Sequence, residues 1–273
     1  MFDRLQLKNY RFFLSDQNYI IIQRKRTSLS LLLVLVFLLA CSGEAPKIAT
    51  QAENSDEILS QNSKQSPKIL TPNEKTRSWK PLFDGVTTEG WHSYLKNTLG
   101  GWQVKDGVLF TPGKQGDIVS DQEYENFELE LEWKIEDQGN SGVFYYVVEK
   151  PAYQKMHETG PEFQIIDDQN YPQELADNQK TGSNSDVKAP SNPSSLSPGS
   201  WNHTRIKAEN GKVEHWLNGK LILEFDMDSP EWKDLVAKSK FAAFDYAKVR
   251  KGHIGLQDHG GPVYFRNIKI REL

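Results

Sequence analysis

The sequence predicts an all-β protein, a two-sheet antiparallel jelly-roll sandwich with one short helix. Residues 127–135 alternate strictly, with apolar side chains at the odd positions and charged ones at the even positions. That pattern is typical of a strand with one buried face and one wet face. Asn-Gly pairs at 210–211 and 218–219 separate three further strand-like runs and predict a three-stranded meander.

The remaining elements follow from the same signals, taken along the chain. An Asp-Gly pair at 106–107 joins two short runs and predicts a hairpin. Ser229 and Pro230 open the one stretch with helix-start signals, which runs to residue 236. The expected strands cover residues 101–105, 108–110, 118–120, 127–135, 140–146, 162–168, 201–208, 213–217, 220–225, 252–259 and 263–270.

The N-terminus has the features of an export signal. Basic residues at 24–26 precede an apolar run, 28–40, that is shorter than the roughly 20 residues a membrane-spanning helix needs. Leu38-Leu39-Ala40-Cys41 resembles a bacterial lipobox, which implies cleavage before Cys41 and acylation of its thiol. Several acyl chains on one residue make a stable anchor. We therefore expect a lipoprotein of the bacterial cell envelope, at the periplasmic face or the outer membrane.

This signal divides the chain into three expected parts. Residues 1–40 form the signal peptide, 41–78 the acylated cysteine and a polar, flexible tether, and 79–273 one folded domain. With one cysteine the chain can form no internal disulfide. A net charge of −4 gives no basic footprint for nucleic acid, and we expect no nucleic-acid partner.

Residues 162–166 carry the most informative pattern for function. Phe163 and Ile165 point to one face of the strand, so Glu162 and Gln164 share the other, roughly 6.5–7 Å apart along the strand. A carboxylate beside an amide on an open sheet face suits the recognition of sugar hydroxyls. We expect the opposite, apolar face to lie on the core.

Other polar or aromatic residues are expected to surround this pair. Asn140 opens the preceding strand, and Tyr145 and Tyr146 could floor or rim a sugar site because aromatic faces stack on pyranose rings. Gln257 and His259 share one face at the end of a late strand, and histidine suits proton transfer near neutral pH. Glu132 lies near the end of its own strand and is expected to share the cleft.

A metal site is a further possibility. The sequence has none of the usual zinc or calcium spacings. Glu162, Asp167 and His259 could still meet around a divalent ion in three dimensions. The sequence leaves the cofactor open.

Six motifs in order resemble one known family over residues 79–273. They are Phe83-Asp84-Gly85 with Gly90-Trp91, Asn140-Ser141-Gly142-Val143-Phe144, Glu162-Phe163-Gln164-Ile165-Ile166-Asp167, Gly199-Ser200-Trp201-Asn202, Leu217-Asn218-Gly219, and Gly255-Leu256-Gln257-Asp258-His259-Gly260 with Phe265-Arg266-Asn267-Ile268. Together they resemble the 3-keto-disaccharide hydrolase domain family, long known as a domain of unknown function. The resemblance implies a concanavalin A-like sandwich and action on glycosides oxidised at C3 of a sugar.

The implied chemistry needs a base near C2, an electrophile for the keto oxygen and an acid for the leaving group. We assign Glu162 or His259 as the base and Gln164 and Asn140 as donors to sugar oxygens. A bound metal ion could serve as the electrophile. Many family members have an arginine where Tyr146 stands, and an aromatic-rich segment where this chain has Ser183-Asn184-Ser185-Asp186.

Two alternatives remain. The same fold serves non-catalytic carbohydrate-binding modules, so a binding lipoprotein is the main rival. A retaining glucanase of this fold needs two carboxylates about 5–5.5 Å apart. The run Glu162-Phe163-Gln164 puts an amide where the usual glucanase strand has its second carboxylate, which disfavours that reading.

Overall fold

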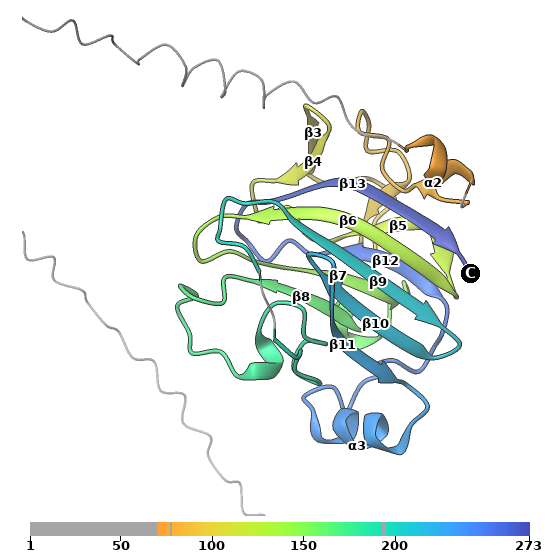
Figure 1. Cartoon of the computed structure of the whole chain (residues 1–273), viewed down its shortest axis with the longest axis vertical. Coiled ribbons are helices and arrows are strands. Elements are labelled where there is room, and N and C mark those ends of the chain that lie inside the picture. The colour runs from red at the N-terminus through yellow and green to blue at the C-terminus, as the bar shows by residue number, and fades with distance from the viewer. Residues whose placement is uncertain (1–69, 77, 193–194) are drawn as a thin grey trace, which may run out of the picture. The chain divides into compact units, whose positions relative to one another are not determined.

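The computed structural model describes residues 70–76, 78–192 and 195–273 (Figure 1). The expected signal peptide, Cys41 and most of the expected tether lie outside these residues. Among the described residues, no helix combines the length and apolar character needed to cross a bilayer.

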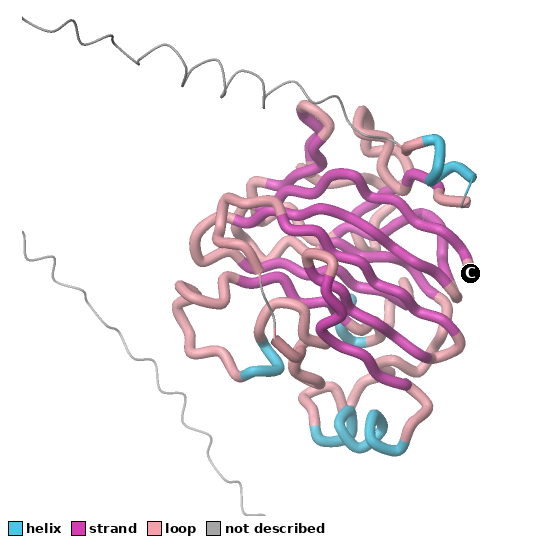
Figure 2. The backbone as a smooth tube through the Cα atoms, viewed as in Figure 1, coloured by secondary structure: helices cyan, strands magenta, loops and turns pink. Residues whose placement is uncertain are grey.

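Two antiparallel sheets pack face to face, which confirms the predicted sandwich (Figures 1 and 2). The larger sheet has the order β11-β10-β9-β6-β13-β4-β3, with β1 paired to β13. Its strands are β1 (Lys80–Pro81), β3 (Gln103–Lys105), β4 (Val108–Thr111), β6 (Phe127–Ile135), β9 (Asn202–Glu209), β10 (Lys212–Leu217), β11 (Lys220–Asp226) and β13 (Val263–Glu272). The smaller sheet has the order β2-β5-β12-β7-β8. Its strands are β2 (Trp91–Ser93), β5 (Ile118–Tyr124), β7 (Asn140–Val147), β8 (Glu162–Ile166) and β12 (Gly252–Leu256).

The three predicted tight turns form as expected. Asp106, Asn210 and Asn218 have φ values of 51°, 50° and 50°, and each is followed by a glycine that also has a positive φ. Two successive positive φ angles define the hairpin turn that these residue pairs favour. The turns set the registers of β3 with β4, β9 with β10, and β10 with β11.

The core lies between the two sheets and is built by the predicted alternation. Leu129, Leu131 and Trp133 of β6 are at most 1% exposed, as are Phe163 and Ile165 of β8. These side chains belong to one continuous apolar cluster. The even-numbered residues of β8 therefore face away from the core, on the open side of the smaller sheet.

Tyr146 departs from its predicted place at a sugar site. It is 1% exposed, its ring packs edge-to-face on Phe127, and its hydroxyl donates to the carbonyl oxygen of Glu125 at 2.8 Å. Its φ of 58° breaks the alternation of β7, so Tyr145 and Tyr146 both enter the core. The prediction for both tyrosines was wrong because alternation assumes an unbroken extended backbone.

The predicted helix is α3 (Pro230–Lys238), and its N-terminal cap is as expected. The hydroxyl of Ser229 accepts from the backbone nitrogen of Trp232 at 3.1 Å. The Trp232 ring stacks on Phe225 of β11, with ring centroids 4.2 Å apart. Two short 3₁₀ turns, η1 (Met156–Glu158) and η2 (Asp177–Gln179), lie in the loops around β8.

A short helix, α2 (Pro72–Thr76), replaces the end of the expected tether. Thr71 and Glu74 form a reciprocal cap, with a backbone-to-side-chain hydrogen bond in each direction at 2.7 and 3.3 Å. The Glu74 carboxylate also pairs with Lys269 of β13. The domain therefore begins before residue 79, because this ion pair fastens α2 to the larger sheet.

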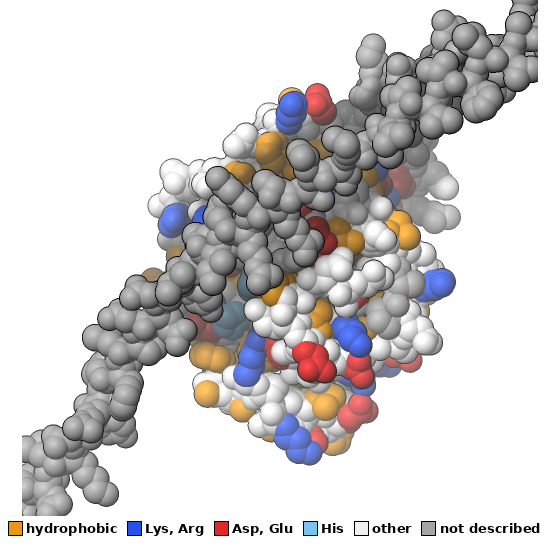
Figure 3. Space-filling model, turned by 90° about the vertical axis from the view of Figure 1, so that its left-hand side faces the viewer, with side chains coloured by type: hydrophobic (Ala, Val, Ile, Leu, Met, Phe, Trp, Pro, Cys, Tyr) orange, Lys and Arg blue, Asp and Glu red, His pale blue; other side chains and the backbone are white. Residues whose placement is uncertain are grey.

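The visible part of the surface in Figure 3 carries both signs of charge. Basic and acidic side chains are interspersed over the described residues on that face. Ion pairs between opposite charges occur among the described residues, such as Lys188 with Glu231 and Lys240 with Asp186. This mixture agrees with the small net charge of −4.

Candidate active site

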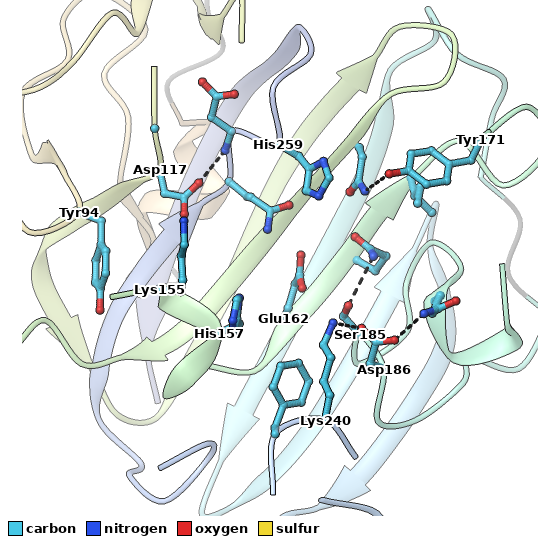
Figure 4. Close-up of a pocket in the computed structure, with 18 of the residues that line it drawn as sticks. Tyr94, Asp117, Lys155, His157, Glu162, Tyr171, Ser185, Asp186, Lys240 and His259 are labelled. Carbon is cyan, nitrogen blue, oxygen red and sulfur yellow. Dashed lines mark hydrogen bonds and ion pairs between the residues drawn. The ribbon is translucent and has the colours of Figure 1, made fainter. Parts of the chain in front are cut away.

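A cleft of about 850 Å³ opens on the face of the smaller sheet that is turned away from the core (Figure 4). Its size is in the upper part of the range for small-molecule pockets. Glu162, Gln164, Asn140, Gln257 and His259 all line it. Five residues predicted from distant parts of the sequence thus meet in one place.

Glu162 lies in the middle of the cleft, on β8 (Figure 4). Its side chain is 7% exposed, and burial raises the pKa of its carboxyl to about 8. The Ser185 hydroxyl and the Lys240 ammonium oppose this rise, and the carboxylates of Asp186 and Asp117 add to it. Glu162 is therefore mostly protonated at neutral pH. Its carboxyl can gain or lose a proton at a pH only slightly above neutral.

Gly142 makes room for the Glu162 side chain. The residue lies on β7, the neighbouring strand, where Gly142 pairs with Gln164. A Cβ atom on Gly142 would lie 2.0 Å from Oε1 of Glu162. No larger residue fits there without displacing the carboxyl.

Gln164 is held in place beside Glu162. Its Oε1 accepts from the backbone nitrogen of Ile165 at 3.1 Å, and its Nε2 donates to Oγ of Ser185 at 3.4 Å. The side chain is 8% exposed. The prediction that Glu162 and Gln164 share an open sheet face is confirmed.

Asn140 and Gln257 present acceptor atoms that lack partners. Oδ1 of Asn140 and Oε1 of Gln257 are buried, and neither has a hydrogen bond to any described residue. The other end of the Asn140 amide donates to the Tyr171 hydroxyl at 3.1 Å. Asn140 was predicted as a donor to sugar oxygens, but here its nitrogen is engaged and its oxygen is the available atom.

His259 reaches the cleft from a loop. Strand β12 ends at Leu256, three residues earlier than predicted, and His259 is exposed at the cleft rim. Asp258 holds this loop, because its carboxylate accepts from the backbone nitrogens of Lys114 and Gln115 at 2.9 and 2.6 Å. The backbone nitrogen of Asp258 donates to Asp117 at 3.0 Å.

Asp117 is another carboxyl of the cleft, and no sequence pattern indicated it. Burial raises its pKa to about 6, against the hydrogen bond from Asp258 and the charge of Lys155. His157 on η1 also lines the cleft, and burial lowers its pKa. Asp117 lies in the loop directly before β5 and His157 in a 3₁₀ segment, so neither had a periodic pattern that could place it.

The segment 183–186, which differs from the family's usual pattern, forms one wall of the cleft. Ser185 and Asp186 line the cleft, and Asp186 pairs with Lys240 (Figure 4). Asn184 is fully buried beneath them, where it accepts from the Tyr246 hydroxyl at 2.6 Å and donates to the Tyr145 hydroxyl at 3.4 Å. Polar residues thus build this wall, as the sequence of 183–186 indicated.

Glu132 does not lie in the cleft. It is on β6 of the larger sheet, where Arg266 donates to it at 2.7 Å and Asn267 donates to it at 2.7 Å. The prediction that the charged side chains of this strand face away from the core was correct, although Glu128 is itself buried beneath Arg205 and Arg271. It was wrong about the site because alternation cannot tell which of the two sheets a strand joins.

Asp167 also lies outside the cleft. Its carboxylate accepts from the backbone nitrogens of Gln138, Gln169 and Asn170 at 2.9–3.1 Å. Burial would raise its pKa, but these donors outweigh burial and lower it. Glu162, Asp167 and His259 therefore do not meet. Within the described ranges no group of three His, Cys, Asp or Glu side chains is arranged to hold a metal ion.

The chain is similar in sequence to a known family of carbohydrate-active proteins. The family model of the 3-keto-alpha-glucoside-1,2-lyase-like domain matches residues 78–271. The 3-keto-disaccharide hydrolase of Bacteroides thetaiotaomicron is 30% identical, over 86% of this chain and 94% of that protein.

Two similar solved structures are also described as glycosyl hydrolases. A candidate glycosyl hydrolase from Parabacteroides distasonis has 42% identity and a TM-score of 0.73, over 76% of this chain and 99% of that one. A second from the same organism has 33% identity and a TM-score of 0.57, over 71% and 99%.

Proposed function

Because the chain belongs to the 3-keto-alpha-glucoside-1,2-lyase-like domain family, we propose that it is an enzyme that cleaves the glycosidic bond of 3-keto glycosides. One observation supports an enzymatic function independently of family membership. A buried carboxyl with a pKa of about 8, Glu162, lies in the middle of a polar cleft that is large enough for a disaccharide. A binding protein needs only sugar contacts, whereas proton transfer needs a group whose pKa lies near the working pH.

The proposed reaction begins at the carbon next to the ketone. The C3 keto group acidifies the C2 proton, and the Glu162 carboxylate removes it to give an enediolate. Its electron pair forms the C1–C2 double bond as the C1–O bond breaks, and the leaving oxygen takes up a proton. Addition of water then places hydroxyl on C1 and hydrogen on C2, which completes a net hydrolysis.

The cleft supplies groups for each step. A base with a raised pKa is well matched to a weakly acidic carbon. Asp117, with a pKa of about 6, holds a fraction of its protons near neutral pH and is our choice for the acid that serves the leaving group. Lys155 and Lys240 line the cleft and bring positive charge to the developing enediolate.

The remaining predicted residues orient the sugar. Oδ1 of Asn140 and Oε1 of Gln257 have unused acceptor capacity, which matches the hydroxyl donors of a sugar. Gln164 and His259 line the same cleft. No step is assigned to a metal ion, since the predicted ligands do not meet.

The test compares a 3-keto glucoside with its unoxidised parent, using the purified full-length chain. Release of the aglycone from the keto sugar alone supports the proposal. Binding of both without turnover would indicate a carbohydrate-binding protein, and release from the parent would indicate an ordinary glycosidase. Full activity in both Glu162→Gln and His259→Ala would remove these residues from the mechanism.

We further propose that the protein is a lipoprotein anchored through Cys41 in the bacterial cell envelope. The support is the sequence Leu38-Leu39-Ala40-Cys41 after a basic and apolar leader. An anchored enzyme of this kind acts on glycosides outside the cytoplasm, at the periplasmic face or the outer membrane.

A further inference from the structure

A second hollow adjoins the cleft. This side pocket, about 290 Å³ in volume, is bounded by residues 136–140 between β6 and β7, residues 171–173, and the 259–262 turn before β13. Asn140, Tyr171, Gln173 and His259 line both the cleft and the side pocket. The two spaces therefore meet along a shared wall of these four residues.

Tyr171 lies at that junction and is held there by two hydrogen bonds. Its hydroxyl accepts from Nδ2 of Asn140 at 3.1 Å, and its backbone nitrogen donates to the carbonyl oxygen of Asp167 at 3.2 Å. The side chain is half-buried and, in Figure 4, its hydroxyl points back toward the cleft. A ring held at the junction of two polar hollows is suited to stacking on a sugar.

The charge of the side pocket differs from that of the cleft. Lys96, Lys155 and Lys240 line the cleft, whereas the side pocket has no lysine or arginine among its described lining residues. Five Asp and Glu side chains accompany the lysines in the cleft, whereas the carboxylates of Glu136 and Asp137 have no lysine or arginine beside them in the described lining of the side pocket. The carboxylates of the side pocket accept hydrogen bonds from hydroxyls and repel anions. The side pocket therefore favours a neutral, hydroxyl-rich group.

We propose that the side pocket is an additional subsite for one neutral sugar unit, so that 3-keto trisaccharides are better substrates than 3-keto disaccharides. Its volume is close to the lower limit of about 300 Å³ for small-molecule sites, which suits a single ring. The proposal rests on the proposed function for its catalytic readout.

The test measures kcat/KM of the full-length protein for a neutral 3-keto trisaccharide and for the matching 3-keto disaccharide. We expect a ratio of at least tenfold in favour of the trisaccharide. A trisaccharide with a uronic acid as its additional unit should lose that advantage. Equal kcat/KM values for the two neutral substrates would overturn the subsite and leave the proposed function intact.

Two variants locate the effect. Gly261 lines only the side pocket, and a Cβ atom there meets nothing within 4 Å. Gly261→Leu fills the side pocket and should bring the ratio close to one, whereas Gly261→Ala should keep it. Tyr171→Ala should also lower the ratio, and Tyr171→Phe, which retains the ring, should preserve more of it.

A binding measurement separates failure of the subsite from failure of the proposed function. If the wild-type protein turns over neither keto substrate, the proposed function is wrong. Calorimetry with the unoxidised trisaccharide and disaccharide then decides the subsite. Tighter binding of the trisaccharide, lost in Gly261→Leu, supports it, and equal affinities refute it.

Discussion

Glu162 keeps its proton at neutral pH because its carboxyl is buried, and the carboxylates of Asp186 and Asp117 add to that effect. A carboxyl whose folded pKa lies above its unfolded value binds more protons in the folded state. Stability is then lost as the pH rises from about 4.5 to about 8. The group that is proposed to act as a base therefore costs stability in the pH range where it is ionised.

The pH dependence of catalysis should show this pKa. If Glu162 is the base and Asp117 the acid, kcat/KM for a 3-keto glucoside should be bell-shaped, with limbs near pH 6 and pH 8, because only the form with Glu162 ionised and Asp117 protonated is active. Asp117→Asn should remove the falling limb. Glu162→Gln should lower kcat by about 10²- to 10⁴-fold. A rising limb centred below pH 5 would contradict the role.

Stability supplies the control for that variant. Each unit of pKa shift corresponds to about 1.4 kcal/mol, so removal of the ionisable group should stabilise the protein at alkaline pH. Thermal unfolding at pH 9 should therefore give a higher midpoint for Glu162→Gln than for the wild type, with little difference at pH 4. A lower midpoint at both pH values would point to misfolding as the cause of lost activity.

Gly142→Ala tests how closely the position of Glu162 is set. The added methyl group would lie 2.0 Å from Oε1 of Glu162, so the carboxyl must move. A displacement of about 1 Å can cost on the order of 10²-fold in rate, and we expect kcat to fall by tenfold or more. Kinetics on a 3-keto glucoside, with circular dichroism to check the fold, would measure this. An unchanged kcat would show that Glu162 tolerates displacement.

At the scale of elements, the loop between β7 and β8 is fastened to the sheet by a histidine. Both ring nitrogens of His92 on β2 meet carboxylates: Nδ1 lies 2.6 Å from Asp121 and Nε2 lies 2.9 Å from Glu149. Two acceptors require the ring to carry both protons. Burial lowers the pKa of His92, but these two partners outweigh it and raise it. The same loop carries Lys155 and His157 into the cleft.

Removal of this histidine should have a pH-dependent effect. Because the folded pKa of His92 is raised, its contribution is full below the ordinary value of 6.5 and is lost as the pH rises through the raised value. His92→Gln should therefore lower the unfolding midpoint more at pH 6 than at pH 9. Asp121→Asn or Glu149→Gln should each reproduce part of the loss. An equal loss at both pH values would mean that His92 acts by packing alone.

Sequence patterns predicted the individual strands better than they predicted which residues of other segments lie beside those strands. The alternation of 127–135 predicted both ends of β6, and the run 162–168 predicted the start of β8 but placed its end two residues too late. In both strands the alternation indicated which side chains face the core. The predicted position of the Tyr146 side chain was wrong because a positive φ at this residue interrupts the alternation of the strand. Asp117, His157 and Lys240 were beyond prediction, since they come from irregular segments that only the tertiary fold brings to the cleft.

At the scale of the whole molecule, the proposed anchor and the folded domain should be separable. Replacement of the acylated residue, Cys41→Ser, should abolish labelling with a fatty-acid analogue and move the protein from the membrane to the soluble fraction. Turnover should stay within about twofold, because Cys41 lies 30 residues before Thr71, where the described domain begins to make contacts. A wild-type protein that takes up no label would refute lipid anchoring.

The overall fold could be predicted because strand pattern and turn chemistry agree along most of residues 79–273. The assignment of strands to sheets could not, since it depends on contacts between distant segments. Glu132 was misplaced for that reason. The helix α2 was missed although Thr71 and Glu74 have the spacing of a capping box; the ion pair of Glu74 with Lys269, far away in sequence, could not be predicted.

Strand β8 is the last strand of the smaller sheet, yet its outer backbone is covered. The nitrogen of Gly182 donates to Gln164 at 2.8 Å, and that of Ser185 donates to Glu162 at 3.1 Å. An uncovered strand edge is a template for pairing between molecules. The segment that shapes the cleft wall therefore also guards against aggregation. Shortening it would be expected to cause self-association as well as altered substrate choice, which limits how freely evolution can remodel this wall.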